Sequence, residues 1–206
     1  MSIGGEGFAF VLQSNGLDAA GCAGTGVGYA QAPQQGCTRN INSSVTIQFD
    51  VHSNLRWEKR TVCRDSTPTG ACSPGASKTT WALESDSEYA MSVYLGGLNG
   101  QRRAVMTYVL EPYERTRFDD GNVHDVRVEY LPPPGLSAQG RLNVFLDGSS
   151  HVALSLPIAL NHTLPGSTAQ GNNTAYVGFT ASTGNTSERH DIISFSYCHL
   201  LGCAAV

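Results

Sequence analysis

The sequence predicts an all-β fold, built as an antiparallel β-sandwich. Nine short runs alternate apolar and polar residues or are rich in β-branched and aromatic residues, which is typical of strands. Glycine is abundant (23 of 206 residues), as are Ser, Thr and Asn, and these residues favour turns. No long segment shows the period of a helix. Since 40% of the residues are hydrophobic, a single domain with a buried core is expected over 1–206.

The expected strands follow one another along the chain. The first covers 7–12 (GFAFVL), and the second lies in 44–54 (SVTIQFDVHSN). The others cover 90–95, 103–110, 123–131, 141–148, 151–158, 175–182 and 191–198. The Asp147-Gly148 pair predicts a tight turn that joins two of these runs into a hairpin.

Three connections differ in character. Segment 19–35 is rich in Gly and Ala, so its backbone can approach a partner closely. Segment 55–83 is a long, polar, Cys-bearing insertion, and loops of this length are usually functional or disordered. Trp57 and Trp81 flank it, and we expect them to anchor it rather than to stack on a ligand. Segment 131–140 (LPPPGLSAQG) predicts a rigid, exposed connection.

The six cysteines form three close pairs in sequence. Local bridges are the simplest connectivity: Cys22 with Cys37, Cys63 with Cys72, and Cys198 with Cys203, the last in a short tail over 198–206. Other connectivities remain open, because six cysteines allow 15. A zinc site is disfavoured because no C-x2-C pair is present.

Four N-x-[ST] sequons begin at Asn42, Asn161, Asn172 and Asn185. Together with the paired cysteines they predict an extracellular or cell-surface glycoprotein from the secretory pathway. The start MSIGGEGFAF lacks the features of a signal peptide, so we expect a trimmed or partial chain. The net charge of -4 and the lack of a basic patch argue against nucleic acid as a partner. No apolar stretch is long enough to span a membrane.

The run 44–54 carries a polar row whose purpose is the main question that the sequence raises. Gln48, Asp50 and His52 alternate with apolar residues, and Asn54 follows where the strand ends. Side chains two residues apart share one face of a strand. The row therefore fits a catalytic site, a metal site or simply a solvated sheet face.

Six stretches in order resemble the L-type (legume-like) lectin family, which has a concanavalin-like jelly-roll β-sandwich. They are GEGFAFVLQ (5–13), GTGVGY (24–29), SVTIQFD (44–50), DGNVHDVRVEY (120–130), LNVFLDG (142–148) and AYVGFTASTGNTSERHDIISFSY (175–197). The family has several strands before the first stretch. We therefore expect that the chain lacks them, and that another chain or a missing N-terminal segment completes the sandwich.

The resemblance implies a calcium site. In the family this strand supplies Glu-x-Asp to a transition metal and to calcium; here Gln48 takes the Glu position and Asp50 keeps the Asp. The implied calcium ligands are Asp50, the His52 carbonyl, Asn54 and, after the insertion, Asp86. The transition-metal site is expected to be lost, because Ala90 stands where the family has a His. Calcium alone fits the remaining oxygen ligands, although Asp50 and Asn54 could instead only stabilise a turn.

The resemblance also implies a shallow sugar site. The family's key acidic residue follows a cis peptide, and Glu6 occupies its place. Gly24, Thr25 and Gly26 correspond to the glycine-rich loop that donates a backbone N–H. Asn54, with Asn185 and Thr186 of the specificity loop, completes the implied site. A glycan on Asn185 would crowd it.

Carbohydrate binding is thus the favoured function, with glycans or glycoproteins as partners. The alternative is a structural or adhesion module that has lost sugar binding. A glycoside hydrolase is disfavoured, because related enzymes need two carboxylates at positions that Gln48 and Ser53 occupy. His124 and His190 are expected to have structural roles.

Overall fold

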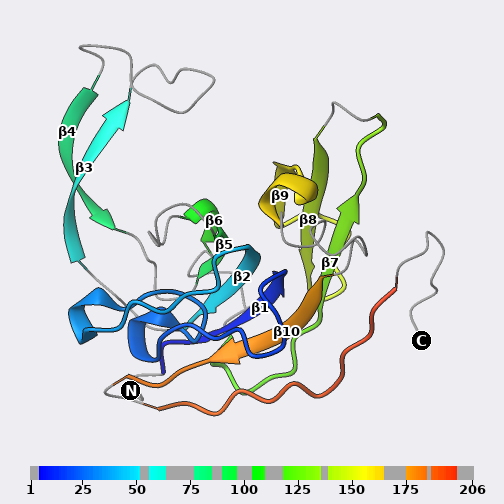
Figure 1. Ribbon diagram of the computed structural model, residues 1–206, viewed down its shortest axis with the longest axis horizontal. Helices are drawn as coiled ribbons and strands as arrows, with labels where there is room; N and C mark the ends of the chain where they lie inside the picture. Colours follow the sequence, from blue (N-terminus) through cyan, green and yellow to red (C-terminus); the bar gives the residue numbers. More distant parts are fainter. Residues whose placement is uncertain are drawn as a thin grey trace.

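The computed structural model describes residues 5–51, 56–63, 77–84, 90–96, 104–109, 118–135, 139–164, 175–184 and 187–198. Within these ranges the fold is all-β, with antiparallel sheets and a single turn of α-helix, α1 (Leu160–Thr163) (Figure 1). The all-β prediction is therefore confirmed.

The larger sheet has five strands in the order β10-β1-β2-β5-β6. Their bounds are Phe8–Gln13 for β1, Ser44–Asp50 for β2, Ala90–Leu95 for β5, Ala104–Val109 for β6 and Tyr176–Ala181 for β10. Every neighbouring pair is antiparallel. The predicted runs lie within a few residues of these bounds because each contains a continuous stretch of apolar, β-branched or aromatic residues.

The smaller sheet joins β7 (Val126–Leu131), β8 (Gly140–Leu146) and β9 (Leu154–Ile158). The predicted Asp147-Gly148 turn is present: both residues have positive φ angles (51° and 67°), and Ser149 donates its N–H to the Leu146 carbonyl at 2.9 Å. Positive φ at both central positions defines a type I′ turn, for which Asp-Gly is a favoured pair. The strand after the turn begins at Leu154, three residues later than predicted.

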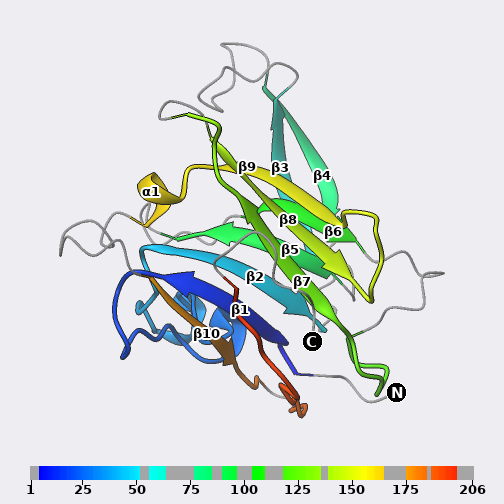
Figure 2. The ribbon, with the colours of Figure 1, turned by 90° about the vertical axis from the view of Figure 1, so that its right-hand side faces the viewer.

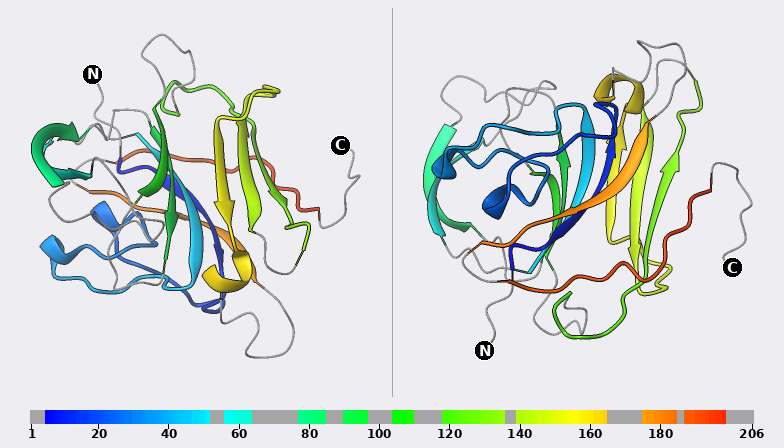
Figure 3. Two further views of the ribbon diagram at one scale, coloured as in Figure 1. Left: turned by 90° about the horizontal axis from the view of Figure 1, so that it is seen from above. Right: turned by 60° about the horizontal axis from the view of Figure 1, so that its bottom comes forward.

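The two sheets share one hydrophobic core. The larger sheet contributes Ile47, Phe49 and Met91, and the smaller sheet contributes Val144 and Leu154, all almost fully buried. Figures 2 and 3 show the two sheets as facing layers. Burial of such side chains is the main stabilising term of a sandwich.

The other face of the larger sheet is also covered. The segment between β1 and β2 contains two short 3-10 turns, η1 (Gly24–Gly26) and η2 (Pro33–Gln35), and packs Val27 and Tyr29 onto β1. A disulfide between Cys22 and Cys37 closes it, as predicted. Gly21 allows a close approach within the segment, since a Cβ there would lie 2.6 Å from the Ala30 nitrogen. As a result, every residue of β2 is buried.

Two predictions about elements were wrong. Segment 191–198 was expected to be a strand, but it has no strand structure. The insertion 55–83 was expected to be a loop, yet it contains β3 (Arg56–Cys63) and β4 (Ser77–Glu84), which pair as a separate antiparallel hairpin. β3 has no regular apolar face, and in β4 the apolar alternation is confined to Trp81 and Leu83, so the period-2 signal was weak.

Candidate ligand-binding site

Four segments that are distant in sequence meet at one end of the larger sheet. They are the start of the described chain at 5–7, the η1 turn, the end of β2 at Asp50, and residues 182–184 and 187–188 after β10. The antiparallel pairing of β1 with both β2 and β10 brings the last three residues of β2 and β10 beside the start of β1, as Phe8 pairs with Phe49 and Ala181. The fold therefore assembles this region from segments that the resemblance predicted to form a site.

Glu6 lies between β1 and the loop after β10. Its carboxylate is against Gly184, because a Cβ built on that glycine would overlap Glu6 Oε1 and lie 3.3 Å from its Cδ. The neighbouring Gly5 donates its N–H to Glu188 Oε2 at 3.3 Å. A half-buried carboxylate held beside a loop backbone can accept hydrogen bonds from hydroxyl groups. The peptide bond before Glu6 is trans, unlike the cis bond that precedes the acidic residue in the family.

Gly7 allows the backbone next to Glu6 to pack closely against the end of β2. It has a φ of +97°, and a Cβ there would overlap the Phe49 carbonyl oxygen and lie 3.3 Å from the Asp50 Cα. The backbone beside Glu6 therefore packs directly against the backbone that carries Asp50.

The polar row of β2 is not a solvated sheet face, so that interpretation was wrong. Gln48 is 1% exposed and Asp50 is 7% exposed. The Tyr29 hydroxyl donates to Gln48 Oε1 at 2.7 Å, and the Gln48 amide donates to Asp50 Oδ2 at 3.2 Å. These bonds compensate the burial of the polar groups and orient the Asp50 carboxylate. Ala90 pairs with Asp50 across β2 and β5.

The η1 turn lies next to the loop after β10. Ser182 Oγ donates to the Gly24 carbonyl at 2.6 Å. Gly24 and Gly26 are buried, Thr25 is half-buried, and Gly26 donates its N–H to the Ala23 carbonyl at 3.3 Å. The exposed Gln35 lies over the turn, because a Cβ on Gly24 would be 2.9 Å from its Cδ.

Several predicted site residues lie outside the described residues: His52, Asn54, Asp86, Asn185 and Thr186. In the described part of the chain, no group of three or more His, Cys, Asp or Glu side chains is arranged to hold a metal ion. Of the implied calcium ligands, Asp50 is the one whose side chain is placed, and it stands at the end of a strand with one carboxylate oxygen bonded to Gln48.

The predicted covalent features are described only in part. Cys198 is disulfide-bonded, but Cys203 lies outside the described residues, as do Cys72 and the side chain of Cys63. The sequon residues Asn42 and Asn161 are exposed, whereas Asn172 lies outside the described ranges. Among the described segments, no helix is long and apolar enough to cross a membrane.

Comparisons with protein-family models, curated proteins and solved structures found no match for this chain. The resemblance to L-type lectins therefore depends on the quoted stretches alone.

The sequence did not indicate some residues of this region. Tyr29 and Gln35 lie in the segment 19–35, which is distinguished by its Gly and Ala content, and the spacing of these two residues indicates no role. Glu188 and His190 lie within the stretch 175–197 that carries the resemblance, so their proximity could have been expected. His190 packs its ring against Phe8 with the ring centroids 5.0 Å apart, and its Nε2 lies 3.9 Å from Glu188 Oε2.

Proposed function

We propose that this chain is a carbohydrate-binding module of the L-type lectin kind, secreted or on the cell surface. The observation that carries the proposal is the convergence of Glu6, the η1 turn, Asp50 and Gly184 at one end of the larger sheet. These residues come from four of the stretches that resemble the family, and a concanavalin-like jelly roll would bring the same stretches together. The Cys22–Cys37 disulfide fits an oxidising compartment.

We further propose that calcium assists binding. Asp50 supplies a carboxylate oxygen at a fixed position, and calcium prefers oxygen ligands. The Ala90 side chain opposite Asp50 provides no imidazole, so a transition metal gains no support from that position. The proposal includes no catalytic role, because Gln48 is an amide where related hydrolases need a carboxylate.

A glycan array probed with the disulfide-intact protein, with and without EDTA, tests the proposal. We expect binding that EDTA abolishes and that Glu6→Gln and Asp50→Asn each reduce at least tenfold. Asp18→Asn is the matched control, since Asp18 is an exposed acid outside the converging segments. Binding that persists in EDTA would contradict the calcium proposal. Equal binding by Glu6→Gln and the control would contradict the proposed sugar site.

One observation favours a structural or adhesion module instead. β10 is the edge strand of the larger sheet, and the extended segment after it exposes Ile193 (72%), Phe195 (52%) and Tyr197 (73%). Contiguous exposed apolar side chains beside a sheet edge mark interaction surfaces. Another chain that completes the sandwich would cover them.

Size-exclusion chromatography with light scattering separates this alternative. A structural module should self-associate or bind its neighbouring chain, and Ile193→Glu should weaken that association. Leu17→Glu is the control, because Leu17 is 84% exposed and lies on the segment between β1 and β2. A monomer that binds glycans would contradict the alternative.

A further inference from the structure

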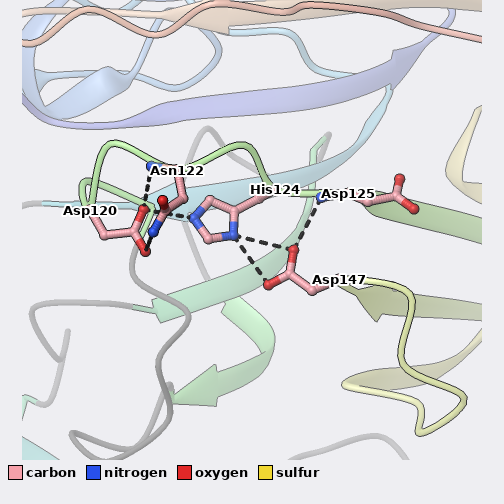
Figure 4. Close-up of polar contacts among 5 residues, drawn as sticks. All are labelled: Asp120, Asn122, His124, Asp125 and Asp147. Carbon is pink, nitrogen blue, oxygen red and sulfur yellow. Dashed lines mark hydrogen bonds and ion pairs between the residues drawn. The ribbon is translucent and has the colours of Figure 1, made fainter.

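His124 bridges two parts of the fold that are far apart in sequence (Figure 4). Its Nε2 lies 3.1 Å from Asp120 Oδ1, in the loop before β7. Its Nδ1 lies 3.1 Å from Asp147 Oδ2, in the turn after β8. The histidine side chain is only 14% exposed. The ring is therefore held between two carboxylates, one at each nitrogen.

This arrangement selects one protonation state. A neutral imidazole carries one N–H, so it can donate to only one of the two carboxylates and would direct a lone pair at the other. An imidazolium donates to both and carries a positive charge between two negative ones. Burial by itself would lower the pKa of His124, but the hydrogen bonds to Asp147 and Asp120 and their charges outweigh it and raise the pKa.

Both carboxylates are fixed by other donors. Asp120 accepts from the backbone N–H and the side-chain amide of Asn122, each at 2.8 Å. Asp147 accepts from the Asp125 N–H at 3.1 Å and has a positive φ of 51° within the type I′ turn. The two acceptors are therefore positioned independently of the ring, and the ring supplies the link between them.

The remaining contact of the ring is apolar. Phe118 packs edge-on against His124, with the ring centroids 5.7 Å apart, and against Phe49 at 5.0 Å. In the described part of the chain, Asp120 and Asp147 are the charged groups in contact with the ring, while the Asp125 carboxylate points away (Figure 4).

We propose that His124 is a proton-operated clamp that ties Asp120, in the loop before β7, to the turn after β8 and releases it when the imidazolium loses its proton. The hydrogen bonds between Asp125 and Asp147 do not involve the ring, and they hold the end of the loop in either protonation state. Phe118 connects this loop to Phe49, the residue before Asp50, so the clamp lies beside the end of β2. The clamp does not depend on carbohydrate binding.

The pH range in which the clamp is closed follows from the pKa shifts of His124 and Asp120. Folding raises the pKa of His124, so the charged ring stabilises the folded protein. This stabilisation is complete below the unfolded pKa of about 6.5 and is lost as the pH rises through the folded pKa. Burial alone would raise the pKa of Asp120, but the bonds from Asn122 and His124 lower it. The Asp120 contribution is therefore lost only at acidic pH, as the pH falls through its folded pKa, and the clamp is closed between these limits.

NMR titration of the histidine ring signals in the whole protein tests the clamp. We expect the pKa of His124 to lie above 6.5 and to shift downward in Asp147→Asn and in Asp120→Asn. Asn keeps an acceptor oxygen but removes the charge. Asp125→Asn is the matched control and should leave the pKa of His124 unchanged. A pKa at or below the ordinary value in the wild type, or an equal shift in the control, would overturn the proposal.

Stability as a function of pH supplies a second measurement. Urea unfolding of the wild type should show stability falling as the pH rises from 6 to 8.5, and His124→Gln should remove that fall. An unchanged pH dependence in His124→Gln would also overturn the clamp, and the wild-type titration remains decisive if the variant does not fold.

Discussion

Replacing Gly7 by alanine should destabilise the protein and disturb the candidate site. Gly7 has a φ of +97°, and a Cβ there would overlap the Phe49 carbonyl oxygen and lie 3.2 Å from its carbonyl carbon. The overlapping atom belongs to the backbone of the central strand β2, whose residues are buried, so it cannot move aside as a flexible side chain could.

The magnitude has two contributions. An alanine in a left-handed conformation costs about 1–2 kcal/mol. Forcing an extra methyl into a packed site costs about 1–3 kcal/mol more. Gly7→Ala should therefore lower the free energy of unfolding by about 2–5 kcal/mol, which for a chain of this size lowers Tm by about 4–20 °C.

Gly36→Ala is the matched control. Gly36 also has a positive φ, +72°, but a Cβ there would meet nothing within 4 Å. It should therefore lose only the conformational contribution, about 1–2 kcal/mol. Urea unfolding followed by circular dichroism measures both variants. Equal losses in the two would refute the close approach of Gly7 to the backbone of Phe49 and Asp50.

Three further variants, the first with a matched control, test the packing of the larger sheet by urea unfolding. Tyr29→Phe removes a buried donor to Gln48 and should cost about 1–3 kcal/mol. Its control, Tyr176→Phe on the edge strand β10, should change stability by less than about 0.5 kcal/mol. Equal effects would contradict the buried hydrogen bonds that join Tyr29, Gln48 and Asp50. Replacing Cys22 and Cys37 together by alanine opens a loop with a sequence separation of 15 and should cost about 3 kcal/mol. Met91→Ala, at a fully buried position, should cost about 2–5 kcal/mol, and a loss below 1 kcal/mol would contradict the shared core.

Local pattern was sufficient for much of the fold. The strands β1, β2, β5 and β10 were predicted within a few residues, because each contains a continuous set of residues that favour a pleated, buried surface. The Asp147-Gly148 turn was predicted because only a few residue pairs accept positive φ at both positions. The prediction of a strand over 191–198 was wrong. A strand needs a partner at hydrogen-bonding distance, and an apolar sequence alone does not supply one.

The sequence by itself predicted the all-β class, the main strands and, as the simplest of 15 connectivities, the Cys22–Cys37 pairing. Tertiary structure decided what the polar row of β2 does. Alternation tells which side chains share a face, but it does not tell what covers that face. The disulfide-closed segment between β1 and β2 covers it, so Gln48 and Asp50 form a buried chain of hydrogen bonds with Tyr29. The bridge made by His124 likewise depends on the fold. Its ring contacts Asp147, which is 23 positions away in sequence, because the turn after β8 lies beside the loop before β7.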